Sequence, residues 1–406
     1  MRPLIALITV FLTLISCSQP KANLLIEQRI HNIENSLVEF STLMSLFQVD
    51  RTKNEDFMTL SDRMEYYNVP GVSIAVINEF ALEWAKPYGV LKADSDQPVT
   101  TDTFFQAAST SKLVTAAIVL HYCEKGIFNL DEDVNNYLKS WNIPENEWTR
   151  RQKVTLRLLL THQAGLPTTN FPQQENAGDP TLVQVLKGEL PAMNKPAIVE
   201  YTPGTKWQYS NLGCVVIQQI LEDVIGKTYS QIAQETVFEP LGVKNSTFLY
   251  PLKKELQAKE AMPHDAERRI GEPALPPTAL AHGGLMTTPS DLAIFTVELM
   301  RAYKGLSNRL LSKEMTHQMF RKELDLDPSM FGVPLSEGLG MILFGEGEDL
   351  VFAHPGSNFP GMNCWLVGYP ETGRGAVIMT NGAKGEILAM EIISAINREY
   401  SQPIDQ

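Results

Sequence analysis

The sequence predicts a mixed α/β (α+β) fold: an antiparallel sheet built from N-terminal and C-terminal strands, flanked by helices, with an inserted all-α lobe. Strand signals occur before about residue 90 and return after about residue 330, and the chain between them is predominantly helical. We assign the helical lobe to about residues 121–290. The early and late strands are therefore expected to share one sheet, with the helices as a lobe beside it.

The composition is that of an ordinary globular protein, with 406 residues of which 44% are hydrophobic and 20% charged. A net charge of −13 argues against nucleic acid and polyanionic substrates as partners. Neither Cys-x-x-Cys nor His-Glu-x-x-His occurs, so no metal site or cofactor is predicted. Beyond the N-terminal region, Cys123, Cys214 and Cys364 have apolar neighbours and are predicted to be free thiols, although a disulfide between two of them stays open.

Residues 1–16 are predicted to be a signal peptide. Arg2 precedes an apolar run from Leu4 to Ile15, which is too short to span a bilayer. The run ends in Leu-Ile-Ser-Cys17, which resembles the lipobox of bacterial lipoproteins, whose cysteine is lipidated. We expect an exported lipoprotein held by Cys17 on the periplasmic side of a bacterial membrane. An ordinary cleaved signal with an incidental cysteine is the alternative.

Residues 17–56 are predicted to be a tether that contains one amphipathic helix. Its apolar residues recur at spacings of three and four, at Ile26, Ile30, Ile33, Leu37, Phe40, Met44 and Phe47. The polar stretch Asp50–Asp56 then separates this helix from the main domain, residues 57–400. The apolar stripe must be buried. Packing on the chain's own domain is favoured over pairing with a second chain, because the connection is short.

Two strands are predicted at the start of the main domain. Val69–Ile77 and Ala81–Trp84 are rich in apolar and β-branched residues, and Asn78-Glu79 between them predicts a tight turn. Ser73 lies in a Gly-x-Ser-x-Ala sequence that approximates the nucleophile elbow of α/β-hydrolases, but an elbow requires a strand-to-helix turn. Since Ser73 falls inside the predicted strand, we interpret it as structural.

Helix-capping residues, glycines and apolar runs predict where the remaining helices and strands lie. Helices are expected after Ser109 with Gly126 closing, at Thr155–His162 before Gly165, at Leu212–Ile225 before Gly226, and after Gly283–Ser290 with Ser290 or Asp291 as the cap. Late strand signals cover Phe331–Phe344, Leu350–His354, Met362–Val367 and Ala376–Thr380. Glu371–Gly375 predicts a hairpin turn, and Ile387–Ile396 predicts a closing amphipathic helix.

The motif Ser109-x-x-Lys112 combines the parts of a nucleophilic site. One helical turn separates the two residues, so hydroxyl and amine share a face, and the first N–H groups of the turn are free to hold an oxyanion. Lys112 can take the serine proton only as a neutral amine, which burial beside the apolar segment Leu113–Leu120 would favour. A plain capping serine followed by a surface lysine is the alternative.

Two further motifs could complete such a site. In Tyr209-x-Asn211, the tyrosine could relay protons and the asparagine amide could hold a substrate carbonyl, although capping and packing are the plainer interpretation. In His354-Pro-Gly356-Ser357, a backbone N–H on a strand could help hold an oxyanion, with the glycine letting a substrate lie close to the chain. His282-Gly-Gly has the same spacing, but it leads into a helix cap, so His354 is preferred.

In this order and spacing, the three motifs resemble those of the serine β-lactamase and penicillin-binding-protein superfamily. The match is closer to the class C-like branch, which also contains esterases and D-amino-acid peptidases. Flanking stretches at 158–166, 283–292 and 355–361 are similar to that family too, and the resemblance covers about residues 57–400. It implies a β-lactamase/transpeptidase-like fold.

The resemblance also implies a role for each motif. Ser109 would be the nucleophile, and Lys112 and Tyr209 would manage its proton. Asn211 would position the substrate and His354 would take the place of the third motif. The N–H groups of Ser109 and Ser357 would form the oxyanion hole, Gly356 would let substrate approach, and His162 would be structural.

One departure from the family pattern narrows the function. Efficient β-lactamases typically carry Lys-Thr-Gly where this chain has His354-Pro355-Gly356. A largely neutral histidine and a proline without a hydroxyl cannot grip a substrate carboxylate. We therefore predict a serine hydrolase that acts through an acyl-enzyme on a small-molecule ester, amide or D-amino-acid peptide. A β-lactamase or D-Ala-D-Ala carboxypeptidase of the same fold is one alternative, and a catalytically silent, lipid-tethered binding protein is another.

Overall fold

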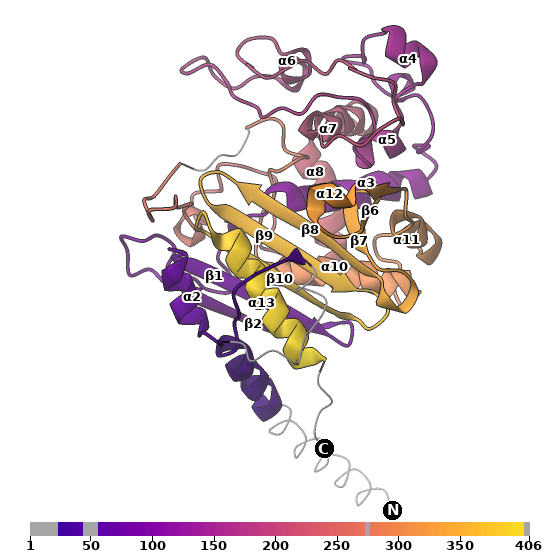
Figure 1. Cartoon of the computed structure of the whole chain (residues 1–406). Coiled ribbons are helices and arrows are strands. Elements are labelled where there is room, and N and C mark those ends of the chain that lie inside the picture. The colour runs from indigo at the N-terminus through magenta and orange to yellow at the C-terminus, as the bar shows by residue number, and fades with distance from the viewer. Residues whose placement is uncertain (1–22, 44–55, 273–276, 402–406) are drawn as a thin grey trace, which may run out of the picture.

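The computed structural model describes residues 23–43, 56–272 and 277–401. The predicted signal peptide, Cys17, Met44 and Phe47 lie outside these residues. Within them, no helix is long and apolar enough to cross a membrane. The architecture is a central antiparallel sheet with helices on both faces and a lobe of short helices at one end (Figure 1).

The sheet has eight strands in the order β2-β1-β10-β9-β8-β7-β6-β5. Their bounds are β1 Gly71–Asn78, β2 Ala81–Gly89, β5 Leu324–Leu326, β6 Leu335–Gly338, β7 Met341–Phe344, β8 Val351–Asn358, β9 Met362–Tyr369 and β10 Arg374–Thr380. β1 pairs antiparallel with β10, with Ile74 opposite Ile378. The prediction that early and late strands share one sheet is therefore confirmed.

Each strand sends alternate side chains to opposite faces of the sheet. Along β1, Ala75 and Ile77 join one buried cluster, while Ile74 and Val76 join the other. On the first face, α10 (Pro289–Tyr303) packs against β1, β9 and β10. On the second face, α13 (Gly385–Tyr400) packs on β9 and β10, with α2 (Leu60–Tyr66) beside it (Figure 1). The sheet is thus buried on both sides.

The lobe lies above the sheet in Figure 1. Its helices are α4 Glu147–Arg151, α5 Leu156–Leu160, α6 Leu182–Lys187, α7 Asn211–Ile225, α8 Tyr229–Ala233 and α9 Glu239–Leu241. Gly226 ends α7 with a φ of 72°, as predicted. The block is not wholly helical, because β4 (Met286–Thr287) pairs with β3 (Phe105–Gln106). The cap of α10 was also mispredicted: Thr288 takes this role, and its hydroxyl accepts the Asp291 N–H at 3.2 Å.

The structure corrects two of the strand predictions, because the chain turns at other residues than expected. The first hairpin turns at Glu79 and Phe80, both with positive φ, and β2 continues past Pro87 to Gly89 because an edge strand tolerates proline. The predicted strand signal from Phe331 to Phe344 is a short helix, α12 (Pro328–Phe331), followed by the β6–β7 hairpin. Gly340 reverses the chain there with a φ of 74°.

The N-terminal segment is helical over residues 23–34 and then leaves the helix. Leu37 instead exchanges both backbone hydrogen bonds with Met58, at 3.1 and 2.9 Å, so the prediction of one helix to Phe47 is wrong. Ile33 and Leu37 are 2% and 0% exposed and belong to the cluster beneath α13. The described part of the apolar stripe therefore packs against the chain's own domain.

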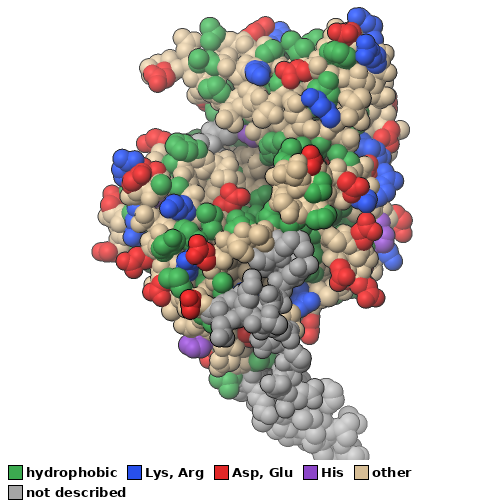
Figure 2. All heavy atoms as spheres, viewed as in Figure 1, with side chains coloured by type: hydrophobic (Ala, Val, Ile, Leu, Met, Phe, Trp, Pro, Cys, Tyr) green, Lys and Arg blue, Asp and Glu red, His purple; other side chains and the backbone are tan. Residues whose placement is uncertain are grey.

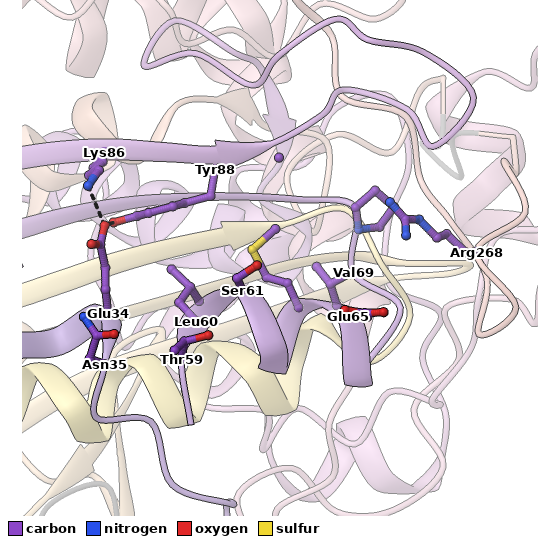
Figure 3. A pocket seen from close by; sticks show the side chains of 13 residues that line it. Glu34, Asn35, Thr59, Leu60, Ser61, Glu65, Val69, Lys86, Tyr88 and Arg268 are labelled. Carbon is purple, nitrogen blue, oxygen red and sulfur yellow. Dashed lines mark hydrogen bonds and ion pairs between the residues drawn. The ribbon is translucent and has the colours of Figure 1, made fainter. Parts of the chain in front are cut away.

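Polar contacts fix this segment to the domain. The Glu34 carboxylate accepts hydrogen bonds from Lys86 and from the Tyr88 hydroxyl of β2, beside an open pocket of about 760 Å³ between α2 and β2 (Figure 3). In a second set of contacts, the buried Glu391 carboxylate of α13 binds Arg63 of α2 and accepts the Phe40 N–H at 3.0 Å. Both side chains of this ion pair are 3% exposed or less, so removing either one would leave the other charge buried without a partner.

The three described cysteines are free thiols. Cys214 and Cys364 are buried, and Cys123 is half-buried. Burial raises the pKa of the Cys123 and Cys364 thiols to about 12, so neither is a ready nucleophile.

Candidate active site

The candidate nucleophile lies in a strained turn at the start of α3 (Ser111–Glu124). Ser109 occupies a 3-10 turn over Ala108–Thr110, so the α-helix begins two residues later than the motif suggested. Ala108 is fully buried with a φ of 48°, a conformation that costs a non-glycine residue energy. Despite the shift, Ser109 and Lys112 still meet, with Lys112 Nζ donating to Ser109 Oγ at 3.1 Å.

Lys112 is 2% exposed and is held from two sides. Its Nζ donates to the His282 carbonyl at 2.7 Å as well as to Ser109 Oγ. Neither partner carries a negative charge. Lys112 Nζ lies within hydrogen-bond distance of the hydroxyl whose proton it would take in the predicted chemistry. Lys112 is therefore placed to accept the serine proton.

Tyr209 lies on the other side of the nucleophile. Its hydroxyl donates to Ser109 Oγ at 2.8 Å, and Lys112 Nζ lies 4.9 Å from the centre of its ring. Ser109 Oγ is thus within hydrogen-bond distance of both an amine and a phenol. The structure brings together the first two motifs, separated by 100 residues in sequence, around one oxygen atom.

His162 holds Tyr209 in place. Its ring packs on the Tyr209 ring with centres 4.4 Å apart. Its carbonyl accepts the Gln208 N–H at 2.8 Å and its Nδ1 accepts the Ser210 N–H at 3.3 Å. Burial, reinforced by the nearby Lys112 charge, lowers the pKa of His162 to about 3, so the imidazole is neutral and can accept. The structural role implied by the sequence resemblance is therefore specific: His162 fixes the residues on both sides of the tyrosine.

The third motif lies on β8, directly against the nucleophile turn. The Thr110 hydroxyl donates to the His354 carbonyl at 3.1 Å. A Cβ atom on Gly356 would lie 2.2 Å from the Ala107 oxygen and 2.9 Å from the Ser109 nitrogen, so only glycine fits. The third motif on β8 and the nucleophile turn are therefore in direct contact at the site.

His354 itself supplies no positive charge. Its Nδ1 lies 2.7 Å from the Pro355 carbonyl oxygen and donates to it. Burial, with a smaller effect from Lys112, lowers the pKa of His354 to about 3. The position that carries a lysine in efficient β-lactamases is therefore occupied by a neutral ring.

One edge of β8 is open beside the nucleophile. β9 pairs with β8 from Phe352 to Asn358, but β7 pairs only from Val351 to Ala353. No other described strand covers the edge at 355–358. The Ser357 hydroxyl donates to Asn363 Oδ1 at 2.8 Å, so the substrate contact predicted for Ser357 falls to its backbone. Figure 2 shows hydrophobic side chains gathered along the recess between the lobe and the sheet.

Asn211 is the first residue of α7, and Ser210 is the cap residue. The Asn211 Nδ2 donates to the Thr169 carbonyl at 3.4 Å, while its buried Oδ1 has no partner among the described residues. The sequence suggested that this amide holds a substrate carbonyl. The Nδ2 group keeps one N–H beyond the bond to Thr169, so that role stays a prediction, and the free Oδ1 is in addition an acceptor that suits a substrate N–H.

Sequence reasoning missed part of the site. His282, considered only as a rival for the third motif, contributes through its carbonyl to Lys112, and its ring packs on Phe171 with centres 4.7 Å apart. The His282-Gly-Gly spacing was the available signal, since Gly283 lies against the Ala108 turn. In the described residues, no group of three or more His, Cys, Asp or Glu side chains could hold a metal ion.

Comparisons with known proteins bear on the family and the fold of the chain. The Beta-lactamase family profile matches residues 59–393. Penicillin-binding protein 4 of Amycolatopsis lactamdurans is 26% identical over 323 residues, which cover 78% of this chain and 82% of that protein. Unguisins hydrolase ungD' of Aspergillus campestris is 28% identical over 209 residues, or 48% of this chain, and the match spans only 36% of that hydrolase.

A solved structure is similar over most of the chain. This structure, of a class C beta-lactamase, superposes with a TM-score of 0.68 and 19% sequence identity, covering 86% of this chain and 95% of that one. At this identity the likeness establishes the fold.

Proposed function

Because the chain belongs to the beta-lactamase family and Ser109 Oγ lies 3.1 Å from Lys112 Nζ and 2.8 Å from Tyr209 OH, we propose that it is a serine hydrolase. It cleaves an ester or amide through an acyl-enzyme. The observation that carries this proposal is that both groups able to take a proton, the Lys112 amine and the Tyr209 phenol, lie within hydrogen-bond distance of the Ser109 hydroxyl. A silent binding protein has no physical need for that convergence.

In the acylation step, Ser109 Oγ attacks the substrate carbonyl carbon while its proton passes to Lys112, which accepts it as the free amine, or to Tyr209, which accepts it as the phenolate. The N–H groups of Ser109 and Ser357 hold the oxyanion that forms. The carbon–leaving-group bond then breaks, and the stored proton passes to the departing oxygen or nitrogen. Water, deprotonated by the same groups, attacks the acyl-enzyme, releases the acid and returns the proton to Ser109.

The third motif supports substrates that lack a carboxylate beside the scissile bond. A lysine and a threonine there could bind a carboxylate, but neutral His354 and Pro355 offer neither a charge nor a hydroxyl. Esters and neutral amides therefore fit better than β-lactams or peptides that end in D-Ala-D-Ala. The unpartnered Asn211 Oδ1 favours a substrate with an N–H near the scissile bond, such as a D-amino-acid amide.

A panel of substrates tests the proposal. p-Nitrophenyl esters, D-amino-acid p-nitroanilides and a chromogenic cephalosporin are compared in wild type and Ser109→Ala. Ester or amide turnover that disappears in Ser109→Ala is expected. Efficient cephalosporin hydrolysis by wild type would favour a β-lactamase instead, and the absence of labelling by a fluorophosphonate together with no turnover would favour the silent binding protein.

The site of action is also proposed from the N-terminal sequence. We propose a periplasmic lipoprotein anchored by Cys17, since an apolar run that ends in Ser-Cys matches the lipobox pattern. Wild type should partition with membranes, and Cys17→Ala should release the protein because a multiply acylated cysteine anchors stably. Soluble wild-type protein after fractionation would contradict this localisation.

A further inference from the structure

Gln106 is a buried residue that the proposed mechanism does not use, although its side chain links two segments of the site. It belongs to β3, three residues before Ser109, and is 0% exposed. Its Oε1 accepts an N–H from the Nδ2 of Asn358 at 2.9 Å, and Asn358 is the last residue of β8. The strand that leads into the nucleophile turn is thus bonded, through two side chains, to the end of the strand that carries the third motif.

Two other contacts join β8 to the same segment. The His354 carbonyl accepts the Thr110 hydroxyl at 3.1 Å. A Cβ atom on Gly356 would lie 2.9 Å from the Ser109 nitrogen, so the two backbones already touch there. Asn358 makes the third contact, and alternate residues of a strand lie about 7 Å apart. Contacts at these three positions fix the orientation of β8 against the nucleophile segment as well as its distance.

The Ser357 N–H, which the proposed mechanism uses to hold the oxyanion, lies between the contacts at Gly356 and Asn358. Of the described strands, only β9 pairs with β8 at this point. The contact at Gly356 limits how closely the two backbones approach, but only an attractive contact opposes their separation. The hydrogen bond between Asn358 and Gln106 supplies that attraction on the far side of Ser357.

The other atom of the Gln106 amide indicates that this bond serves function more than stability. Its Nε2 is buried and has no hydrogen-bond partner among the described residues. A buried donor without a partner lowers stability, and a methionine would fill similar space without a polar atom. A purely structural position would therefore gain stability from an apolar residue, whereas an acceptor for Asn358 requires the amide.

We propose that Gln106 is a positioning residue for the oxyanion hole, whose bond to Asn358 sets the separation between the N–H groups of Ser109 and Ser357. The inference rests on the proposed hydrolase function. The oxyanion forms only as the carbonyl carbon becomes tetrahedral, so a displaced donor weakens binding of the transition state more than binding of the substrate. Loss of the bond is therefore expected to lower kcat with little change in KM.

Gln106→Met separates this role from simple packing, because it removes both amide atoms and keeps the length of the side chain. We expect kcat for a p-nitrophenyl ester to fall about tenfold with KM within about twofold. The thermal unfolding temperature should stay the same or rise, since the unpaired donor is gone and water can reach the half-buried Asn358. The affinity for phenylboronic acid, which forms a tetrahedral adduct with a serine hydroxyl, should fall in parallel with kcat. Asn358→Ala should also lower kcat, and combining it with Gln106→Met should cause no further loss.

Gln219→Met on α7 is the matched control. Gln219 is 5% exposed, and its Oε1 is also buried without a partner among the described residues. Its Nε2 donates to Asp223 of the same helix at 3.0 Å. The substitution thus removes a buried amide with one unpaired atom that forms no bond to β8, and it should leave kcat unchanged.

The outcomes that overturn the inference are distinct. Wild-type kcat in Gln106→Met, an equal loss of kcat in Gln219→Met, a lowered unfolding temperature that accompanies the loss of activity, or additive losses in the double variant would each contradict it. Should Gln106→Met not fold, Asn358→Ala at the half-buried end of the bond decides. A lower kcat with unchanged KM would then support the proposal, and an unchanged kcat would overturn it. If wild type shows no Ser109-dependent turnover, the hydrolase function itself fails, which is a different result.

Discussion

Adding one methyl group at Gly356 should separate the third motif from the nucleophile. A Cβ atom there would lie 2.2 Å from the Ala107 oxygen, 2.9 Å from the Ser109 nitrogen and 3.0 Å from the Thr110 nitrogen. All three are backbone atoms, so no side-chain rotation relieves the contact. Restoring ordinary contact with the oxygen requires β8 and the turn to move apart by about 1 Å, which is expected to cost about a hundredfold in kcat/KM. Overpacking of this kind should also lower stability by about 1–3 kcal/mol.

The assay compares Gly356→Ala with Gly283→Ala, which adds the same methyl group beside the same turn. A Cβ on Gly283 would lie 3.8 Å from Ala108, an ordinary contact, and we expect kcat/KM within a few-fold of wild type. Ester hydrolysis, fluorophosphonate labelling and thermal unfolding are measured for both variants. Wild-type kcat/KM in Gly356→Ala would refute the inference that β8 and the nucleophile turn must touch for catalysis.

Three other predictions follow from the described contacts. His354→Lys combined with Pro355→Thr should raise cephalosporin hydrolysis relative to ester hydrolysis about ten- to a hundredfold, because a charge-assisted hydrogen bond to a carboxylate contributes about 1.5–3 kcal/mol; an unchanged ratio of kcat/KM values would contradict this. Burial lowers the pKa of His162 and His354 to about 3, against an ordinary value of 6.5. Between these values the unfolded chain binds more protons than the folded protein, so the free energy of unfolding should fall as pH drops below about 6.5, by up to about 1.4 kcal/mol per pH unit for each histidine. Urea unfolding at pH 7 and pH 5 checks the sign, and equal stability at both would count against it. Glu391→Ala should lower the free energy of unfolding by about 3–5 kcal/mol because it leaves Arg63 buried without its partner, whereas a loss below about 1 kcal/mol would show that the pair is not stabilising.

Local sequence patterns predicted the sheet and the longer helices well. Apolar β-branched runs place β1, β9 and β10, and the glycine at 226 marks the end of α7, because each depends on residues close in the chain. The N-terminal helix was overextended for a physical reason. Leu37 keeps helical spacing with Ile33, but it gains two backbone hydrogen bonds with Met58 and a buried position, and tertiary contacts outweigh local periodicity.

In the candidate site, too, local patterns could be predicted from the sequence and contacts between distant residues could not. The motifs of Ser109, Tyr209 and His354 could be found from residue type and spacing, whereas the contacts between them could not. The His282-Gly-Gly spacing marked the place, but the role of the His282 carbonyl could not be predicted from residue type, because every residue carries a carbonyl.

Trapping the acyl-enzyme tests the hydrolase function most directly. Wild type is mixed with a p-nitrophenyl ester, quenched in acid during turnover, and examined by intact-mass and peptide mass spectrometry. We predict an adduct of the acyl mass on the peptide that contains Ser109, and no adduct with Ser109→Ala, whose turnover should fall by about a millionfold. Turnover that persists in Ser109→Ala, or an adduct on any other residue, would contradict the proposed mechanism.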